Sequence, residues 1–361
     1  MGVEIKLTDK EFPVSPVFVD FLHRHLENRA HEATWHDQLS EELIPAQADE
    51  KQKAAVAVAD RVLQDPAGQK AILRSYELLT ALLTGQPEKL RPFYERYRFI
   101  CVVGCPRHGG SYLTKQLFRA TGMDPERVPN AIAHDGFPDA APFQFKENYN
   151  SLTTMIQNMA EYLAMVETYF ANSRVFDNRI VVPKKATKAA YHGAFFSAAL
   201  GPDTEYIITL RHPLSMAQSV LDKSGGMPKG GIFNVRSAIE RWALDDWMKW
   251  GVAEATVKKM SYLDVFLGYW KRYHYQIAME AIPTMAATHL LPYGGASMTG
   301  AVKKFYSGFG TSMEPEPFKE APKPDFGAQE NQKGDAVVQQ VAAFWKSLGL
   351  TFPLDGVLER N

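Results

Sequence analysis

The chain has 361 residues, of which 45% are hydrophobic and 22% are charged, and its formal net charge is −1. This length suffices for one large α/β domain or two smaller ones, and the composition is that of a globular rather than a disordered protein. A net charge near zero provides no basic field for nucleic acid, and no apolar run approaches the length of a transmembrane helix. We therefore expect neither a nucleic acid nor a membrane as a partner.

Cys101 and Cys105 are the only two cysteines. They stand close together in one stretch, so the sequence holds no disulfide framework and too few thiols for a structural metal site. The first residues contain no apolar signal core, and Lys6 stands where a myristoylation motif requires Ser or Thr. These features predict a cytoplasmic protein with no bound metal.

Residues 1–96 are helical in pattern. Ser15 and Pro16 are typical of an N-cap and a first-turn proline, and they precede apolar residues on one helical face: Phe18, Phe21, Leu22 and Leu26. Further helices are expected over residues 49–63 and 68–83. Because no strand pattern interrupts this region, we interpret residues 1–96 as a helical N-terminal extension that precedes, or is laid against, an α/β domain of residues 97–361.

Beyond residue 96, short apolar strands alternate with helices. Strands are expected at 99–103, 180–182, 205–210 and 289–291, and helices at 111–120, 151–169, 188–200, from 214 onward and at 335–348. This alternation predicts an α/β fold in which a central parallel sheet carries helices on both faces. The closing helix is expected to pack on the sheet, and the tryptophans at helical positions are expected in the core: Trp242, Trp247, Trp250 and Trp270.

The strand at 99–103 is followed by a glycine-bearing turn and an amphipathic helix. From Gly104, the spacing Gly-x4-Gly-x-Ser matches the phosphate-binding loop of nucleoside triphosphatases, but Gly110 occupies the position of their lysine. A basic residue, Arg107, stands inside the turn instead. The backbone N–H groups and the positive helix end still favour an anion, whereas the usual ligand of a γ-phosphate is missing. The loop therefore indicates a nucleotide other than ATP.

A second motif follows the strand at 205–210, where the chain reads Arg211-His212-Pro213 and continues as a helix that carries Ser219 two turns later. Ligands of open parallel sheets bind at the carboxyl ends of the strands. Arg211 can reach a phosphate there with its charged fork, and Ser219 can reach the same phosphate with its hydroxyl. The two motifs together predict one nucleotide site at this edge of the sheet.

Together, the two motifs resemble those of the sulfotransferases that use 3′-phosphoadenosine 5′-phosphosulfate (PAPS). The family loop Pro-(Lys/Arg)-Ser-Gly-Thr-Thr is similar to residues 106–111, and the family's 3′-phosphate motif is matched by Arg211, Pro213 and Ser219. The resemblance covers residues 99–350 and implies a P-loop-like sulfotransferase fold with PAPS as co-substrate and no metal. It gives Arg107 the catalytic basic position. It also implies contacts to PAPS from Arg107, His108, Gly109, Gly110, Ser111, Tyr112, Arg211 and Ser219.

The loop departs from the family pattern at His108 and Gly110, which replace a Ser and a Thr. His108 is expected to add charge beside the sulfuryl group. Many members carry Lys-Thr-His after the second strand, whereas this chain has two lysines and no histidine, so either Lys184 or Lys185 is expected to face the sulfate; Lys185 is our catalytic candidate.

The general base must then come from elsewhere in the chain. The best candidates are His134 and Asp135, on the loop after the first helix of the α/β domain, with Asp135 either accepting the proton or orienting the imidazole. His192 is a weaker candidate.

We therefore expect a sulfotransferase that moves a sulfuryl group from PAPS to a hydroxyl or amine of a small molecule. Two further functions compete with it: a P-loop kinase of small molecules, disfavoured by Gly110, and a non-catalytic nucleotide-binding member of the family. Two loops are candidate lids, at 224–231 and 314–325, and the glycine-rich first one is favoured. The acceptor pocket is expected from the 131–150 loop and the tryptophan-bearing helices, and a homodimer is left open.

Overall fold

The computed structural model describes residues 14–27, 45–135, 137–138, 150–285, 287–321 and 323–359. Among the described residues, the helices before the first strand are α1 (Pro16–Leu26), α3 (Pro45–Gln64), α4 (Pro66–Thr84) and α5 (Pro87–Arg96). Helix α1 begins as predicted, because the Ser15 hydroxyl accepts a hydrogen bond from the Phe18 N–H at 3.2 Å. Its predicted apolar face is also confirmed, since Phe18, Phe21 and Leu22 are buried.

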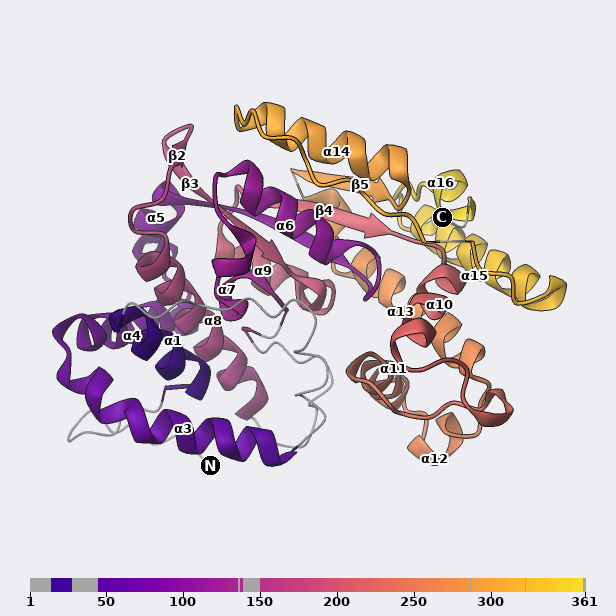
Figure 1. Cartoon of the computed structure of the whole chain (residues 1–361), viewed down its shortest axis with the longest axis horizontal. Coiled ribbons are helices and arrows are strands. Elements are labelled where there is room, and N and C mark those ends of the chain that lie inside the picture. The colour runs from indigo at the N-terminus through magenta and orange to yellow at the C-terminus, as the bar shows by residue number, and fades with distance from the viewer. Residues whose placement is uncertain are drawn as a thin grey trace.

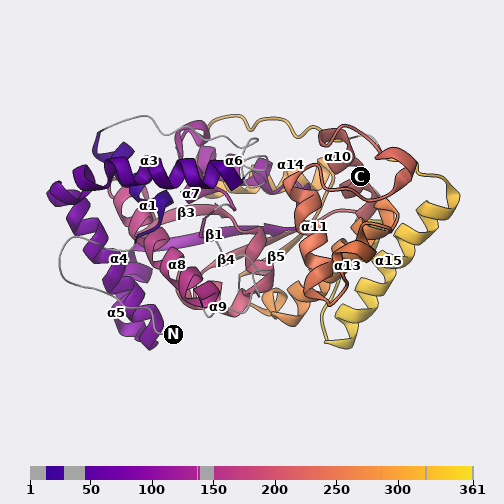
Figure 2. The same ribbon diagram turned by 90° about the horizontal axis from the view of Figure 1, so that it is seen from below.

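The N-terminal helices lie against α8 (Asn150–Tyr169), at one end of the molecule (Figure 1 and Figure 2). Arg74 of α4 donates two hydrogen bonds to Glu167 of α8, at 2.9 and 3.0 Å, and the Ser15 N–H donates to Glu161 at 2.9 Å. The buried side chains of α1, α3 and α4 belong to the same hydrophobic core as one face of the sheet. Of the two arrangements left open for these helices, they are laid against the α/β part.

Five strands form one sheet in the order β2-β3-β1-β4-β5, with bounds Val175–Phe176, Arg179–Lys185, Tyr97–Gly104, Glu205–Leu210 and Thr288–Pro292. Strands β3, β1, β4 and β5 are parallel, but β2 is antiparallel to β3. The sheet is therefore mixed and not wholly parallel as predicted. Strand β2 comes from a hairpin whose turn residues, Asp177 and Asn178, have φ of 48° and 65°. So short a turn joins antiparallel strands, and its two positive φ angles are typical of Asp and Asn.

Helices cover both faces of the sheet, as predicted (Figure 1). Alternate side chains of β1 separate the two layers: Phe99, Cys101 and Val103 belong to the core shared with α8, and Ile100 and Val102 to a second core. The second core is closed by α6 (Gly110–Ala120) and α14 (Gly295–Gly308). The first includes α9 (Gly193–Leu200) and α13 (Tyr262–Met279).

The remaining elements are 3-10 turns and helices that connect this frame: η1 (Pro125–Arg127), α7 (Asn130–Ala133), η2 (Thr187–Tyr191), α10 (Pro213–Lys223), η3 (Lys229–Gly231), α11 (Ala238–Lys249), α12 (Glu254–Val257), η4 (Ile282–Thr284), α15 (Ala328–Ser347) and α16 (Leu354–Leu358). Within the described part of the chain, no helix combines the length and apolar character needed to cross a membrane.

The closing helix α15 packs chiefly on α13 and not on the sheet as predicted. The buried indole of Trp345 donates a hydrogen bond to His274 O of α13 at 2.9 Å. The apolar face of α15 thus packs on α13, although the sequence analysis expected it to pack on the sheet. Among the tryptophans expected in the core, Trp270 is fully buried, whereas Trp250 is 49% exposed at the end of α11.

Candidate functional site

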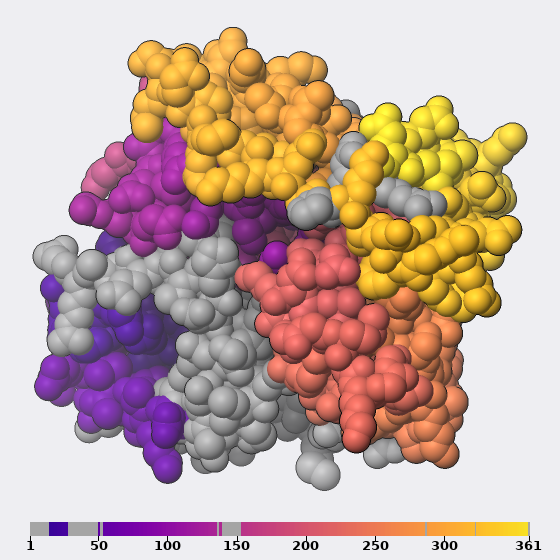
Figure 3. Space-filling model, turned by 45° about the vertical axis from the view of Figure 1, so that its right-hand side comes forward, coloured from indigo at the N-terminus to yellow at the C-terminus, as the bar shows by residue number. Residues whose placement is uncertain are grey.

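A cavity of about 420 Å³ lies at the carboxyl edge of the parallel strands. The strands end there at Gly104, Lys185, Leu210 and Pro292, and the segments that follow them supply walls of the cavity. Three residues offered for the site, His108, Lys184 and His192, do not line the cavity. The other predicted residues do: Arg107, Gly109, Gly110, Ser111, Tyr112, His134, Asp135, Lys185, Arg211 and Ser219. In Figure 3, the magenta, salmon and orange surfaces of these segments meet around a hollow.

The loop after β1 holds Arg107 in an unusual backbone conformation. His108 N–H donates to Cys105 O at 3.2 Å and closes a turn in which Arg107 has a φ of 72°. A turn with proline second and a positive φ third normally has glycine at the third position. The strain at Arg107, on the order of 1 kcal/mol, accompanies a defined contact, because the Arg107 Nε donates to the Ser219 hydroxyl at 3.0 Å. The two predicted motifs therefore meet through these side chains.

Two glycines allow the loop to take this path. A Cβ on Gly104 would lie 2.0 Å from the Thr209 hydroxyl oxygen, and Gly109 has a φ of 84°. Gly109 is the N-cap of α6, and no side chain caps the helix there. The first N–H groups of α6 are thus available to an anion at the positive end of the helix. Gly110 and Ser111 stand in this first turn and line the cavity.

Arg211 supports the loop from the end of β4. Its Nη1 donates to Arg107 O at 2.9 Å, and its guanidinium carbon lies 4.0 Å from the centroid of the Tyr293 ring. Burial lowers the pKa of both Arg107 and Arg211, although a guanidinium keeps its charge at neutral pH. Two arginine charges on one cavity favour an oxyanion of high charge, such as a phosphate monoester.

His108 is not where the sequence placed it. Its side chain is fully buried, its Nδ1 lies 3.0 Å from Thr209 O, and its ring stacks on His274 at 5.5 Å. Burial holds the pKa of His108 well below its ordinary value, so the imidazole is neutral. The side chain therefore anchors the loop to the core and brings no charge to the cavity.

Lys185 faces the cavity and binds both candidate bases. Its Nζ lies 2.5 Å from the Asp135 carboxylate and 3.4 Å from His134 Nε2. Asp135 also accepts hydrogen bonds from the Thr187 N–H at 2.6 Å and from the Thr187 hydroxyl at 3.0 Å. The adjacent residues His134 and Asp135 thus converge on one ammonium group. The carboxylate orients Lys185, where the sequence suggested that it would orient His134.

Lys185 also occupies the space beside Gly110, where the loop of nucleoside triphosphatases carries its lysine. A Cβ on Gly110 would lie 3.5 Å from the Cε of Lys185 and 3.8 Å from its Cδ, both ordinary van der Waals distances. The pairing of β1 with β3 sets this position, because Val102 lies opposite Lys185 in the sheet. A neighbouring strand therefore supplies a positive charge where the loop itself has none.

The two candidate bases differ in protonation. Burial, and next the charge of Lys185, lowers the pKa of His134 to about 3, so its imidazole is neutral at pH 7. Burial alone would raise the pKa of Asp135, but the Lys185 ammonium and the hydrogen bonds from its partners lower it below the ordinary value. The lowered pKa of Asp135 makes its carboxylate a weak base, and both its oxygens accept short contacts, whereas His134 Nε2 lies 3.4 Å from the Lys185 Nζ. His134 is therefore the better proton acceptor of the two.

Lys184 and His192, which the sequence offered as a sulfate contact and a base, lie away from the cavity. The described residues that line the cavity include neither Lys184 nor His192. The Lys184 side chain is buried on the α8 side of the sheet, where its Nζ lies 4.5 Å from the centroid of the Tyr162 ring. Burial, with a further contribution from Lys249, lowers the pKa of His192 to about 4.

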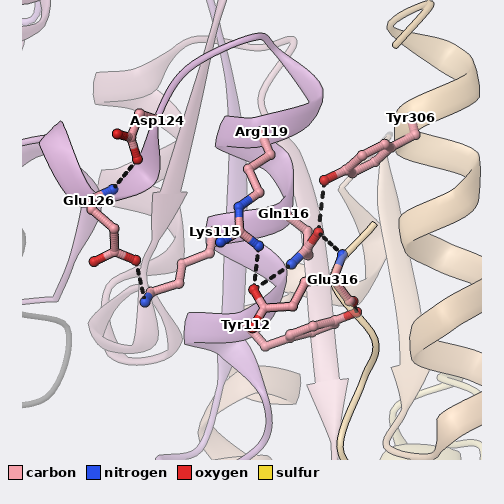
Figure 4. A network of polar contacts seen from close by, with 8 residues as sticks. All are labelled: Tyr112, Lys115, Gln116, Arg119, Asp124, Glu126, Tyr306 and Glu316. Atoms are coloured by element: carbon pink, nitrogen blue, oxygen red, sulfur yellow. Dashed lines mark hydrogen bonds and ion pairs between the residues drawn. The ribbon is translucent and has the colours of Figure 1, made fainter. Parts of the chain in front are cut away.

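Of the two loops proposed as lids, the one at 314–325 borders the cavity, and the glycine-rich loop that the sequence favoured does not. The lining includes residues 316–321 and none from 224–231. We call residues 314–321 the strap. Glu316 of the strap binds α6 through an ion pair with Arg119 and a 3.5 Å contact with Gln116, whose Oε1 accepts from the Tyr306 hydroxyl at 2.8 Å (Figure 4). The proline-rich segment is therefore tied to the helix that begins at the phosphate loop.

Aromatic rings continue this attachment. The Tyr112 hydroxyl donates to Glu316 O at 2.7 Å (Figure 4). The Phe318 ring lies edge-on to Tyr112 and to Tyr293, with 5.0 Å between centroids in each pair. Tyr112, for which the resemblance implied a contact to PAPS, thus lines the cavity together with a ring from the strap.

No family model, curated protein or solved structure matches this chain. What the site can do follows from its own residues. Within the described residues, no group of three or more His, Cys, Asp or Glu side chains is placed to hold a metal. The groups that converge include an uncapped helix N-terminus, Arg107 and Arg211, a neutral histidine, and Lys185 paired with the ionised Asp135. Together they suit an anionic ligand and a proton transfer.

Several lining residues were not singled out from the sequence for this site. Tyr293 follows β5 as Arg211 follows β4, so the strand-end rule that located the arginine was also available for the tyrosine. Trp242, which was assigned to the core, and Ile239 bring one face of α11 to the cavity, and α11 is one of the tryptophan-bearing helices expected at the acceptor pocket. Of the loop expected at the acceptor pocket, residues 136 and 139–149 lie outside the described residues.

Proposed function

We propose that this protein is a sulfotransferase that uses PAPS and transfers its sulfuryl group to a hydroxyl or amine of a small molecule. One observation carries the proposal: three groups line the same cavity. They are Arg107, which donates from a strained turn to the Ser219 hydroxyl of α10, the uncapped N-terminus of α6, and Lys185 of β3. The α6 N–H groups and Lys185 fit a 5′-phosphosulfate, and Arg211 with Ser219 fits a 3′-phosphate.

The donor supplies an activated sulfuryl group, whose bond to the 5′-phosphate oxygen breaks as a bond to the acceptor forms. Arg107 and Lys185 stabilise the negative charge that develops on the sulfuryl and leaving oxygens. His134 Nε2 accepts the acceptor proton, and Asp135 holds the Lys185 ammonium in place. Burial, and next the charge of Lys185, lowers the pKa of His134 to about 3. An anion that neutralises this lysine removes the second cause and should make the imidazole a stronger base in the loaded site.

The decisive experiment is metal-free thermal unfolding with 3′,5′-adenosine bisphosphate. A ligand at a hundred times its Kd stabilises a protein by about 2.7 kcal/mol, which raises the Tm of a chain of this size by roughly 3 to 4 °C. Arg211→Ala should abolish most of this shift, while Arg241→Ala, an α11 variant outside the cavity lining, should keep it.

The possible outcomes of this experiment separate the candidate functions. If ATP with magnesium stabilises the protein and the bisphosphate does not, the result points to a kinase. A bisphosphate shift that survives in Arg211→Ala would refute the assignment of the nucleotide site. Release of the bisphosphate from PAPS, followed over a panel of phenols, alcohols and amines, then distinguishes an enzyme from a protein that only binds the nucleotide.

A further inference from the structure

Lys184 is a buried lysine next to the catalytic candidate Lys185. Its Nζ donates to three backbone carbonyls: Ile132 O at 3.1 Å, His134 O at 2.8 Å and Phe137 O at 2.6 Å. An ammonium group has three N–H donors, so the three acceptors match its full capacity. All three belong to residues 132–135 and 137, which we call the His134 segment.

The two lysines contact this segment from opposite faces of β3. Successive strand residues point to opposite faces, so Lys184 lies on the α8 side and Lys185 on the α6 side. Lys184 binds the backbone of the segment, whereas Lys185 binds the side chains of His134 and Asp135. His134 is held by both, through its carbonyl oxygen and through its ring.

A buried charge is costly, and its retention calls for compensating contacts. Lys184 is 1% exposed. The face of the Tyr162 ring lies 4.5 Å from its Nζ and adds a cation–π contact to the three hydrogen bonds. A hydrophobic residue at 184 would fill the same space but leave three carbonyls without this donor. The arrangement is therefore specific for a cation that organises backbone.

We propose that Lys184 is a positioning residue, whose ammonium fixes the backbone of the His134 segment so that His134 and Asp135 meet Lys185 at the cavity. Only the expected effect of Lys184 on turnover rests on the proposed function. The geometric part concerns the order of the segment and the environment of His134, and both can be measured without any substrate.

The protonation of Lys184 offers a second means of testing the proposal. Several ionisable groups surround the amine: Asp135 and His134 in the segment, Lys185 in β3, Lys188 in η2, Cys101 in β1 and Tyr162 in α8. Burial lowers the pKa of Lys184 to about 7, against the opposing effects of Asp135 and Cys101. Above this pKa the amine has two N–H donors for three carbonyls, so its hold on the segment weakens.

The test compares Lys184→Met with Lys303→Met, an exposed lysine of α14, in the full chain. Hydrogen exchange is followed at the amides of Ile132, Ala133 and His134, which donate to backbone carbonyls at 2.9 to 3.0 Å. We expect at least tenfold faster exchange at these amides in Lys184→Met and no change in Lys303→Met. By NMR, the pKa of His134 should rise by at least one unit, because the segment moves away from Lys185 and because the charge of Lys184, which also lowers this pKa, is lost.

Unchanged exchange and an unchanged His134 titration in a folded Lys184→Met protein would overturn the proposal. If that variant does not fold, the wild-type chain is compared at pH 6 and pH 8.5, after correction for intrinsic exchange. Severalfold weaker protection of the three amides at pH 8.5 supports the proposal, and equal protection overturns it.

With a working acceptor, Lys184→Met should lower kcat at least tenfold and change bisphosphate affinity less than threefold. A fall in bisphosphate affinity as large as the fall in kcat would contradict positioning of the His134 segment alone. If the wild-type protein transfers no sulfuryl group, the proposed function fails, while the exchange and titration results still decide the role of Lys184.

Discussion

The two sides of the cavity are built in different ways. On the phosphate-loop side, residues 104–112 are continuous in sequence, and the contact that Arg107 makes with α10 is to a neutral hydroxyl, that of Ser219. On the lysine side, β3 and the His134 segment come from separate parts of the chain, and Lys185 lies against a carboxylate. Charge is thus presented to a ligand on one side and compensated within the protein on the other.

This difference teaches where binding and where turnover should reside. Arg107 faces a neutral hydroxyl, so its charge is available to attract an incoming anion. Lys185 is already paired with Asp135, so it attracts the same anion less strongly. The phosphate-loop side should therefore dominate nucleotide binding and stabilise the transferring group. The lysine side should tune proton transfer, and variants on each side are expected to separate these effects.

The largest expected effect comes from Arg107→Ala. Loss of one preorganised donor to a developing charge costs about 3 to 4 kcal/mol, so turnover with PAPS should fall by roughly 100- to 1,000-fold. Arg107→Lys should recover part of it, and the exposed Arg241→Ala serves as the control. Single-turnover release of the bisphosphate measures the effect, and a loss below fivefold would contradict the role of Arg107.

The next largest effect tests whether Lys185 replaces the missing loop lysine. Lys185→Met should lower turnover by about 30- to 100-fold, because it removes a charge from the sulfuryl position and leaves Asp135 buried without its cation. Adding Gly110→Lys should restore at least fivefold, since a Cβ at 110 meets only ordinary contacts and no positive φ opposes a side chain there. If the double variant is no better than Lys185→Met, charge at residue 110 cannot substitute for Lys185.

A pH effect on stability should come from the lysine side. The unfolded chain protonates His134 near pH 6.5, whereas the folded chain resists protonation down to about pH 3. Between these values the unfolded state binds more protons, so the free energy of unfolding falls as pH falls, by about 1.4 kcal/mol per unit from this residue. His134→Gln should lack this component. Between pH 7 and pH 5, the free energy of unfolding of the wild-type protein should therefore fall by about 2 kcal/mol more than that of His134→Gln.

Urea unfolding of both proteins from pH 7 to pH 5 checks this prediction. Asp246 acts in the opposite direction, because burial raises its pKa to about 6, but it is common to both proteins and cancels in the comparison. Parallel pH curves for wild type and His134→Gln would mean that the imidazole is not held neutral by its surroundings.

The smallest effect belongs to the strap. Glu316→Gln removes the ion pair with Arg119, and because the Glu316 side chain is 51% exposed, the stability should fall by less than about 1 kcal/mol. The strap should nevertheless exchange amide hydrogens faster, and the bisphosphate should dissociate two- to threefold faster. The exposed Glu314→Gln is the matched control. Equal dissociation rates in the two variants would mean that this ion pair does not hold the strap over the ligand.

Local patterns predicted the phosphate-loop side well, because contiguous residues determine it. The strand at 205–210 has the predicted bounds, and the helix predicted at 111–120 begins one residue earlier. The positive φ of Arg107 was not foreseen, since the residue type argues against it. Hairpin strand β2 was also missed, because two residues are too short for an alternation signal, although Asp177-Asn178 was a readable turn.

The lysine side could be predicted only in part. His134, Asp135 and Lys185 were named, but the choice between Lys184 and Lys185 depends on which face of β3 meets the cavity, and neighbouring helices decide that. The role of the strap was underestimated because its attachment comes from Glu316 reaching α6, about 200 residues away in sequence. Such contacts between distant segments have no local signature.

The pairing of β1 with β3 has a consequence for how phosphate loops are diagnosed. A motif search along one continuous window treats Gly110 as the loss of an essential lysine. In three dimensions the charge is relocated, because Lys185 ends the adjacent strand and reaches the same space. A loop without its lysine should therefore be judged together with the last residues of the neighbouring strand, because a lysine there can bring a positive charge to the same space.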